Sequence, residues 1–353
     1  MSFDLKQELK YFGAVESEII LLDSETPSLI DYLDLLGTKR TQQISNSRTI
    51  SIRPNAVIEI EGKPALYILN ADYLSQNLSI RTNELLNLRR IIACRGDMAP
   101  LAVLEPGKLT VYSSEIKTKL PKPTVIASND SSAQWYIRDA LLGKGLKYDL
   151  KEFEKFGEQH LDELAIHDLL FNLLTGVSDC LLKTKALKNK FDEVLSLVGR
   201  ALFTRFLIDR SIINSETFQD IYEYDKPEDC FNTAELATKS CLWLENNFNG
   251  ELLPLPEPKS RYAEYFETLD DEVFKILSRV LYRTSGGGQL HLDWGFLDFA
   301  HVPVGLLSEV YEQYAHQHFS VEARHESVHY TPHHIAKYVL DQAFEGLTTC
   351  SKV

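Results

Sequence analysis

A histidine-rich stretch raises the first chemical possibility. Six of the ten histidines lie within residues 316 to 334, where residues 325 to 329 read His-Glu-Ser-Val-His. On a helix, this H-E-x-x-H spacing turns both imidazoles toward one zinc ion, and the glutamate activates the metal-bound water. Here Thr331 and Pro332 follow closely, and proline disfavours helical geometry in the residue before it. A zinc protease also needs a third ligand further along, where Glu345 is the only glutamate left. We therefore expect no metal ligands here but a polar loop rich in histidine.

Two Glu-x-Lys tripeptides suggest a second metal chemistry. They are Glu61-Gly62-Lys63 and Glu115-Ile116-Lys117, and Asp31 or Asp34 could supply a further carboxylate. In Mg²⁺-dependent nucleases two carboxylates hold the metal and a lysine polarises the attacking water. However, the first tripeptide precedes Pro64 at the tip of an expected hairpin, and turns are often built from such residues. A recognition or scaffold module is the favoured interpretation, and Mg²⁺ would be a cofactor only if a nuclease were present.

Charged residues recur at i+4 or i+5 along one long predicted helix. They are Arg200, Arg205, Asp209 and Arg210. They could contact DNA or another, catalytic, domain. The favoured alternative is ion pairing within the helix, around a buried leucine and phenylalanine face.

An aromatic cluster precedes a later predicted helix. Trp294, Phe296 and Phe299 could stack on a base, but a core anchor for the following helix is favoured. The sequence contains no G-x-S-x-G, no P-loop and no cysteine next to a histidine.

Length and charge set limits on the fold and its partners. The 353 residues exceed what one hydrophobic core usually supports, so two domains are expected. The apolar share of 44% and the charged share of 25% are typical of soluble globular proteins. The net charge is −14, whereas a surface that grips nucleic acid carries a basic stripe. Any DNA contact by this chain would have to be local, or be made by another segment.

Three features predict a cytoplasmic protein with no membrane partner. No apolar run reaches the roughly 18 residues that a membrane span needs. The opening "MSFDLKQELKYFG" has neither a cationic leader nor an apolar stretch. The cysteines are odd in number, scattered and never spaced C-x-x-C, which is typical of reduced thiols. They are Cys94, Cys180, Cys230, Cys241 and Cys350.

The sequence predicts an α+β fold that positions the candidate site residues. It consists of a small N-terminal α/β-sheet module followed by a mainly α-helical domain. Residues 1–125 form the α+β module, in which residues 27–37 and the first half of 84–96 have helical spacing. Residues 55–69 and 98–114 are each predicted to be a hairpin, around Glu-Gly-Lys-Pro and Glu-Pro-Gly-Lys turns.

The apolar period then changes to 3.6 residues. Residues 126–134, polar and rich in serine, are taken as a linker, and 135–325 as a helical domain. Residues 326–353 would start a further domain, where Thr331 can cap a helix and Pro332 can occupy its first turn. The expected helices lie within 153–184, 188–212, 232–249, 269–284, 302–319 and 331–346.

Four stretches in order carry a family resemblance. They are "SLVGRALFTRFLIDRSII" (196–213), "WLENNFNGELLPL" (243–255), "WGFLDFAHVPVGLLSEVYEQY" (294–314) and "HYTPHHIAKYVL" (329–340). Together they resemble the region before the catalytic core of adenine-N6 DNA methyltransferases, of the fused restriction–modification or phage-defence kind. The resemblance covers about residues 135–353 and, more loosely, residues 1–125.

The resemblance implies a cofactor site and a reaction. Tyr330, Thr331 and Pro332 match the Tyr-Thr-Pro motif that opens a helix against S-adenosylmethionine, and a helix N-terminus is a favourable place for the methionine carboxylate. Zinc chemistry is thereby disfavoured further. The family transfers a methyl group to adenine N6 after the base is extruded from DNA.

The sequence also departs from the family. A glycine-rich strand–turn and an Asn-Pro-Pro-Tyr-like tetrapeptide should follow, and neither occurs. We therefore expect a fragment or subunit that is inactive alone, acts on DNA through the complete enzyme, and has its catalytic half in the same or a separate chain. The alternatives are a non-catalytic assembly protein of a DNA-defence complex and an N-terminal Mg²⁺-dependent nuclease module.

Overall fold

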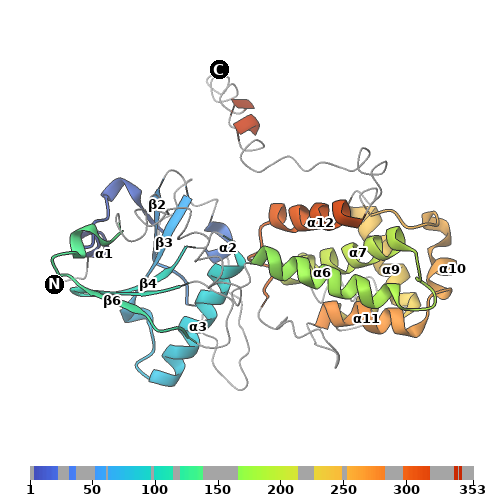
Figure 1. Ribbon diagram of the computed structural model, residues 1–353, viewed down its shortest axis with the longest axis horizontal. Coiled ribbons are helices and arrows are strands. Elements are labelled where there is room, and N and C mark those ends of the chain that lie inside the picture. The colour runs from blue at the N-terminus through green and yellow to red at the C-terminus, as the bar shows by residue number, and fades with distance from the viewer. Residues whose placement is uncertain are drawn as a thin grey trace. The chain divides into compact units, whose positions relative to one another are not determined.

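The computed structural model has the expected α+β architecture (Figure 1). It divides into two compact units, residues 1–166 with 296–301, and residues 167–295 with 302–353. The structure describes residues 4–22, 32–36, 52–60, 63–96, 99–113, 120–137, 166–213, 226–248, 253–282, 297–318, 338–340 and 342–343.

The first unit is built on a six-stranded sheet in the order β1-β2-β3-β4-β5-β6. Neighbouring strands are antiparallel except β3 and β4, which are parallel. A parallel pair needs a crossover connection, and α3 (Leu78–Cys94) lies between these two strands in the sequence. Pairing of β2 with β3 and of β4 with β5 confirms the two predicted hairpins. The strands are β1 (Ile19–Leu21), β2 (Ala56–Ile60), β3 (Lys63–Asn70), β4 (Leu101–Glu105), β5 (Lys108–Tyr112) and β6 (Thr124–Ala127).

Side-chain alternation along the strands gives the sheet two apolar faces. On β2, Ala56 and Ile58 belong to one core cluster together with Leu9 and Phe12, near α1 (Leu5–Lys10). Val57 belongs to the other cluster, with leucines of α3. Asn77 caps α3 by accepting from two backbone N–H groups, and the helix is longer than the sequence predicted. The short elements of this unit are η1 (Glu16–Glu18), α2 (Leu33–Leu36), η3 (Ala71–Tyr73) and η4 (Ala133–Trp135).

The residues expected to form a linker lie inside the first unit. Ile126 and Ala133 are buried in the first core cluster. Ile137 N–H donates to the Phe12 carbonyl (3.1 Å), which ties this segment to the end of α1. Gly13 has φ +90° and a Cβ there would collide with the Gln134 carbonyl, so glycine is needed at this contact. Serine and other polar residues made 126–134 look like a linker, but the isolated apolar residues among them supply the packing.

The second unit is helical, as the 3.6-residue period predicted. Fourteen of the 19 residues of α7 are buried, so α7 is its central helix, and charged residues on it need partners. Thr233 caps α9 by accepting from Leu236 N–H (3.2 Å). The elements are α6 (Ile166–Leu182), α7 (Phe191–Asp209), η6 (Pro227–Phe231), α9 (Ala234–Asn247), η8 (Lys259–Arg261), α10 (Tyr262–Glu267), α11 (Asp271–Tyr282) and α12 (Val304–His318).

Candidate functional site

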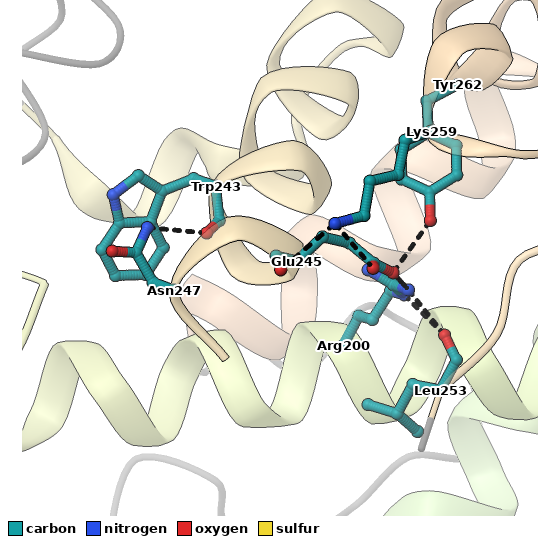
Figure 2. A network of polar contacts seen from close by, with 7 residues as sticks. All are labelled: Arg200, Trp243, Glu245, Asn247, Leu253, Lys259 and Tyr262. Carbon is teal, nitrogen blue, oxygen red and sulfur yellow. Dashed lines mark hydrogen bonds and ion pairs between the residues drawn. The ribbon is translucent and has the colours of Figure 1, made fainter. Parts of the chain in front are cut away.

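Arg200, in the middle of α7, is the centre of a buried polar network (Figure 2). Its Nε and Nη2 both donate to the Leu253 carbonyl, at 2.9 and 2.6 Å. Nη2 also pairs with the Glu245 carboxylate of α9. Arg200 is 1% exposed, so its charge is compensated within the protein. The guanidinium therefore fixes α9 and the segment at Leu253 onto α7.

Glu245 collects the remaining partners of the network. The Tyr262 hydroxyl donates to it (2.8 Å), and Lys259 Nζ lies 3.6 Å from its second oxygen. Burial acts to raise the pKa of Glu245, but the hydrogen bonds from Arg200 and Tyr262 outweigh it and the pKa is lowered. Burial, followed by the bond to Glu245, raises the pKa of Tyr262 to about 12. Near neutral pH, neither side chain exchanges a proton readily, so the network holds structure rather than performing acid–base catalysis.

The same place on α7 brings together three of the four stretches that carry the family resemblance. A Cβ on Gly199 would lie 2.7 Å from Leu253 Cδ2 and 2.9 Å from Tyr311 Cε2. Gly199 and Leu253 belong to the first two stretches, and Tyr311 to the third. The absence of a side chain at Gly199 thus allows these segments to approach α7 closely. The fourth stretch, with Tyr330, Thr331 and Pro332, lies outside the described residues except for its last three positions.

The other charged residues of α7 also have partners. Arg205 pairs with Asp209 one turn on, as the favoured interpretation predicted, but also with Glu228 and with the Leu281 carbonyl (2.5 Å). Arg210 donates to the Val302 carbonyl (2.9 Å) and lies 4.3 Å from the Phe206 ring centroid. Ion pairing within α7 therefore accounts for only some of the contacts of its charged residues, because three arginines bind carbonyls or carboxylates of other segments. Arg200 and Arg205 are buried and do not form a DNA-facing surface.

Two cysteines of the helical unit have thiols that are poor nucleophiles. Cys230 and Cys241 are buried and free, and burial raises the pKa of each to about 12. Because the thiolate is the nucleophile and the metal ligand, these cysteines are suited to packing only.

Asp34, considered above as a metal ligand, is engaged in a different cluster in the first unit. Its carboxylate pairs with Arg95, and its Oδ2 lies 3.1 Å from His301 Nδ1. Arg95 also donates to the Tyr67 hydroxyl (2.8 Å). Burial acts to raise the pKa of Asp34, but the bonds to His301 and Arg95 outweigh it and the pKa is lowered. The carboxylate is thus committed to protein partners.

The structure gives no support to metal chemistry in the parts it describes. Within these residues no group of three or more His, Cys, Asp or Glu side chains could hold an ion. Lys63 begins β3 beside the hairpin turn, as expected. Asp31, Glu61, Gly62, the tripeptide 115–117 and the H-E-x-x-H residues 325–329 lie outside the described part of the chain.

The aromatic cluster and the C-terminal helix are described only in part. Phe299 is fully buried just before α12, which agrees with a core anchor, while Trp294 and Phe296 lie outside the described residues. Tyr338, Val339 and Leu340 are helical, with exposed fractions of 65, 57 and 54%.

Comparisons with known proteins find no match among protein-family models, curated proteins or solved structures. Among the helices described, none combines the length and the apolar character needed to cross a bilayer.

Proposed function

We propose that this chain is the N-terminal part of an adenine-N6 DNA methyltransferase of a restriction–modification or phage-defence system. It would act in the cytoplasm, position a catalytic half, and supply one wall of the S-adenosylmethionine site through Tyr330, Thr331 and Pro332. Methyl transfer would require the glycine-rich turn and the Asn-Pro-Pro-Tyr-like motif, which these 353 residues do not contain.

The packing around Gly199 and Arg200 is the observation that supports this proposal best. Three of the four stretches that carry the family resemblance, through their residues and their order, contribute to this packing. Gly199, Leu253 and Tyr311, one residue from each stretch, lie against one another, so the three stretches share one packing site. Arg200 further ties the second stretch to the first through the Leu253 carbonyl. The matched residues thus serve one purpose, which is to hold the helical unit together.

A non-catalytic assembly protein of a DNA-defence complex is the second candidate. It is favoured by the use of Arg200 and Arg205 in buried pairs, which is a structural use of charge. An assembly protein would keep this helical scaffold and bind a partner without contributing to a methyl-donor pocket.

Methyl transfer by a reconstituted enzyme tests the proposal. The same or an adjoining reading frame should encode the glycine-rich and Asn-Pro-Pro-Tyr-like motifs. That catalytic half, purified with and without this chain, is incubated with duplex DNA and S-adenosylmethionine carrying a labelled methyl group. We expect label on adenine N6 only when both parts are present. Equal methylation without this chain, or the absence of any such neighbour, would favour the assembly protein.

A further inference from the structure

An exposed basic loop connects α6 to α7. Residues 183–190, here called the lysine loop, read Lys-Thr-Lys-Ala-Leu-Lys-Asn-Lys and contain no acidic residue, in a chain of net charge −14. Lys183, Lys185, Lys188 and Lys190 are all exposed. Lys190 pairs with Glu193 at 3.2 Å. Within the described residues, the other three lysines have no ion-pair partner.

The lysine loop is held in place from its inner side. Leu187 is fully buried and Thr184 is 3% exposed, with its hydroxyl donating to the Leu181 carbonyl (2.7 Å). Ala186 N–H donates to Asp270 Oδ2 at 3.1 Å, which fixes the loop to the residue before α11. Asn189 has φ +63° and turns the chain into α7. The inward residues therefore leave Lys183, Lys185 and Lys188 facing solvent.

This arrangement fits a strongly anionic partner. At physiological salt the Debye length is about 8 Å, so acidic groups further away are largely screened from the three lysines. Among the described residues, two carboxylates contact the loop: Asp270 accepts from the backbone N–H of Ala186, and Glu193 pairs with Lys190. The other three lysines of the loop are left uncompensated by these two groups. A local positive patch can thus attract anions even though the whole chain is negative.

We propose that the lysine loop binds the phosphate backbone of duplex DNA, without reading its sequence. Duplex DNA carries about one charge per 1.7 Å of axis, which makes counterion release on contact with lysine strongly favourable. Lysine binds phosphate as a point charge and does not need the paired geometry of arginine. The choice of duplex DNA over other polyanions rests on the proposed function, and the location of the patch rests on the loop itself.

Salt-dependent binding of a short labelled duplex to the full chain, followed by fluorescence anisotropy, tests the proposal. The triple variant Lys183→Gln, Lys185→Gln, Lys188→Gln should bind roughly tenfold or more weakly at low salt. Its plot of log affinity against log salt should be shallower, by about 0.9 for each lysine that contacts a phosphate.

A matched variant controls for the change in net charge. Lys122→Gln, Lys226→Gln, Lys275→Gln removes three exposed lysines elsewhere in the chain and should leave the salt slope unchanged. All three proteins should give the same circular dichroism spectrum, since the altered side chains are exposed. An unchanged slope for the loop variant, an equal loss in the control, or no duplex binding by the unaltered chain would overturn the proposal.

Other polyanions and the methyl donor separate the possible failures. Tighter binding to single-stranded nucleic acid or to anionic vesicles than to the duplex would overturn the assignment to duplex DNA. If duplex binding depends on the loop but S-adenosylmethionine never binds with a catalytic half present, the proposed function fails while the lysine loop stands. If S-adenosylmethionine binds normally but the affinity for the duplex does not depend on the loop, the lysine-loop proposal fails while the proposed function stands.

Discussion

Arg200 carries a charge into the middle of the helical unit, and its partners make that possible. It binds Glu245 and the Leu253 carbonyl while it is 1% exposed. A buried ion pair can be neutral in net stability compared with apolar residues, but the loss of one partner strands the other charge in the interior. Replacing one partner of this ion pair should therefore lower the free energy of unfolding more than replacing both partners with apolar residues.

Replacement of Arg200 by Met should lower the free energy of unfolding of the helical unit by about 3–5 kcal/mol, because Glu245 is left partly uncompensated. The double variant Arg200→Met, Glu245→Leu should be more stable than the sum of the single losses predicts, by roughly 0.5–3 kcal/mol. Urea titrations followed by circular dichroism give the four free energies. If the losses in unfolding free energy of the two single variants simply add up in the double variant, Arg200 and Glu245 are not energetically coupled as described.

Asp34 should make stability depend on pH in the acid range. Its pKa is lowered in the folded protein from an ordinary value of about 3.9, so the unfolded chain takes up the proton first. The stabilisation is complete above that ordinary value and is lost as the pH falls through the lower folded one. Asp34→Asn should therefore reduce the urea midpoint of the first unit near neutral pH, with a deficit that shrinks in acid. Asp72→Asn, at an exposed position, is the control, and a deficit independent of pH would count against this account.

Among the elements, α7 shows why a glycine occupies the middle of a buried helix. Alanine would ordinarily favour a helix by about 1 kcal/mol over glycine. At Gly199, however, the new methyl would meet Leu253 and Tyr311 at 2.7 and 2.9 Å, which is closer than packed side chains allow. Overpacking of this kind costs about 1–3 kcal/mol.

Gly199→Ala should consequently lower the free energy of unfolding, by about 1 kcal/mol after the gain in helix propensity is subtracted. Thermal unfolding of the variant measures the change. Gly176→Ala, the same substitution within α6, isolates the propensity contribution. A stabilised Gly199→Ala protein would show that α9, α12 and their flanking segments do not press on α7 as described.

How far the sequence predicts these elements depends on the range of the interactions. The two hairpins were predictable from four turn residues, and the helices from apolar spacing, because both signals are local. The partners of Arg200 and Asp34 were missed: Glu245 is 45 positions from Arg200, and His301 is 267 from Asp34. No periodicity links residues so far apart, so the charged residues of α7 were expected to pair mainly along the helix itself. The serine-rich stretch before η4 was misleading for a related reason, since two buried residues outweigh its polar composition.

For the whole molecule, the division into two units follows the chain only approximately. Residues 296–301 belong to the sheet unit, although the sequence on both sides of them belongs to the helical unit. His301 is held by Asp34, and the carbonyl of the next residue, Val302, accepts a hydrogen bond from Arg210. Neither unit is therefore a single stretch of sequence, and experiments should use the full chain.

We propose that this chain supplies one wall of a methyl-donor pocket. Isothermal calorimetry of S-adenosylmethionine, with this chain alone and together with the catalytic half, tests it most directly. We predict little or no binding to the chain alone and clear binding to the two parts together, lost on Tyr330→Ala but retained in the exposed control Tyr73→Ala. Equal binding by the catalytic half alone, or binding indifferent to Tyr330, would contradict the account.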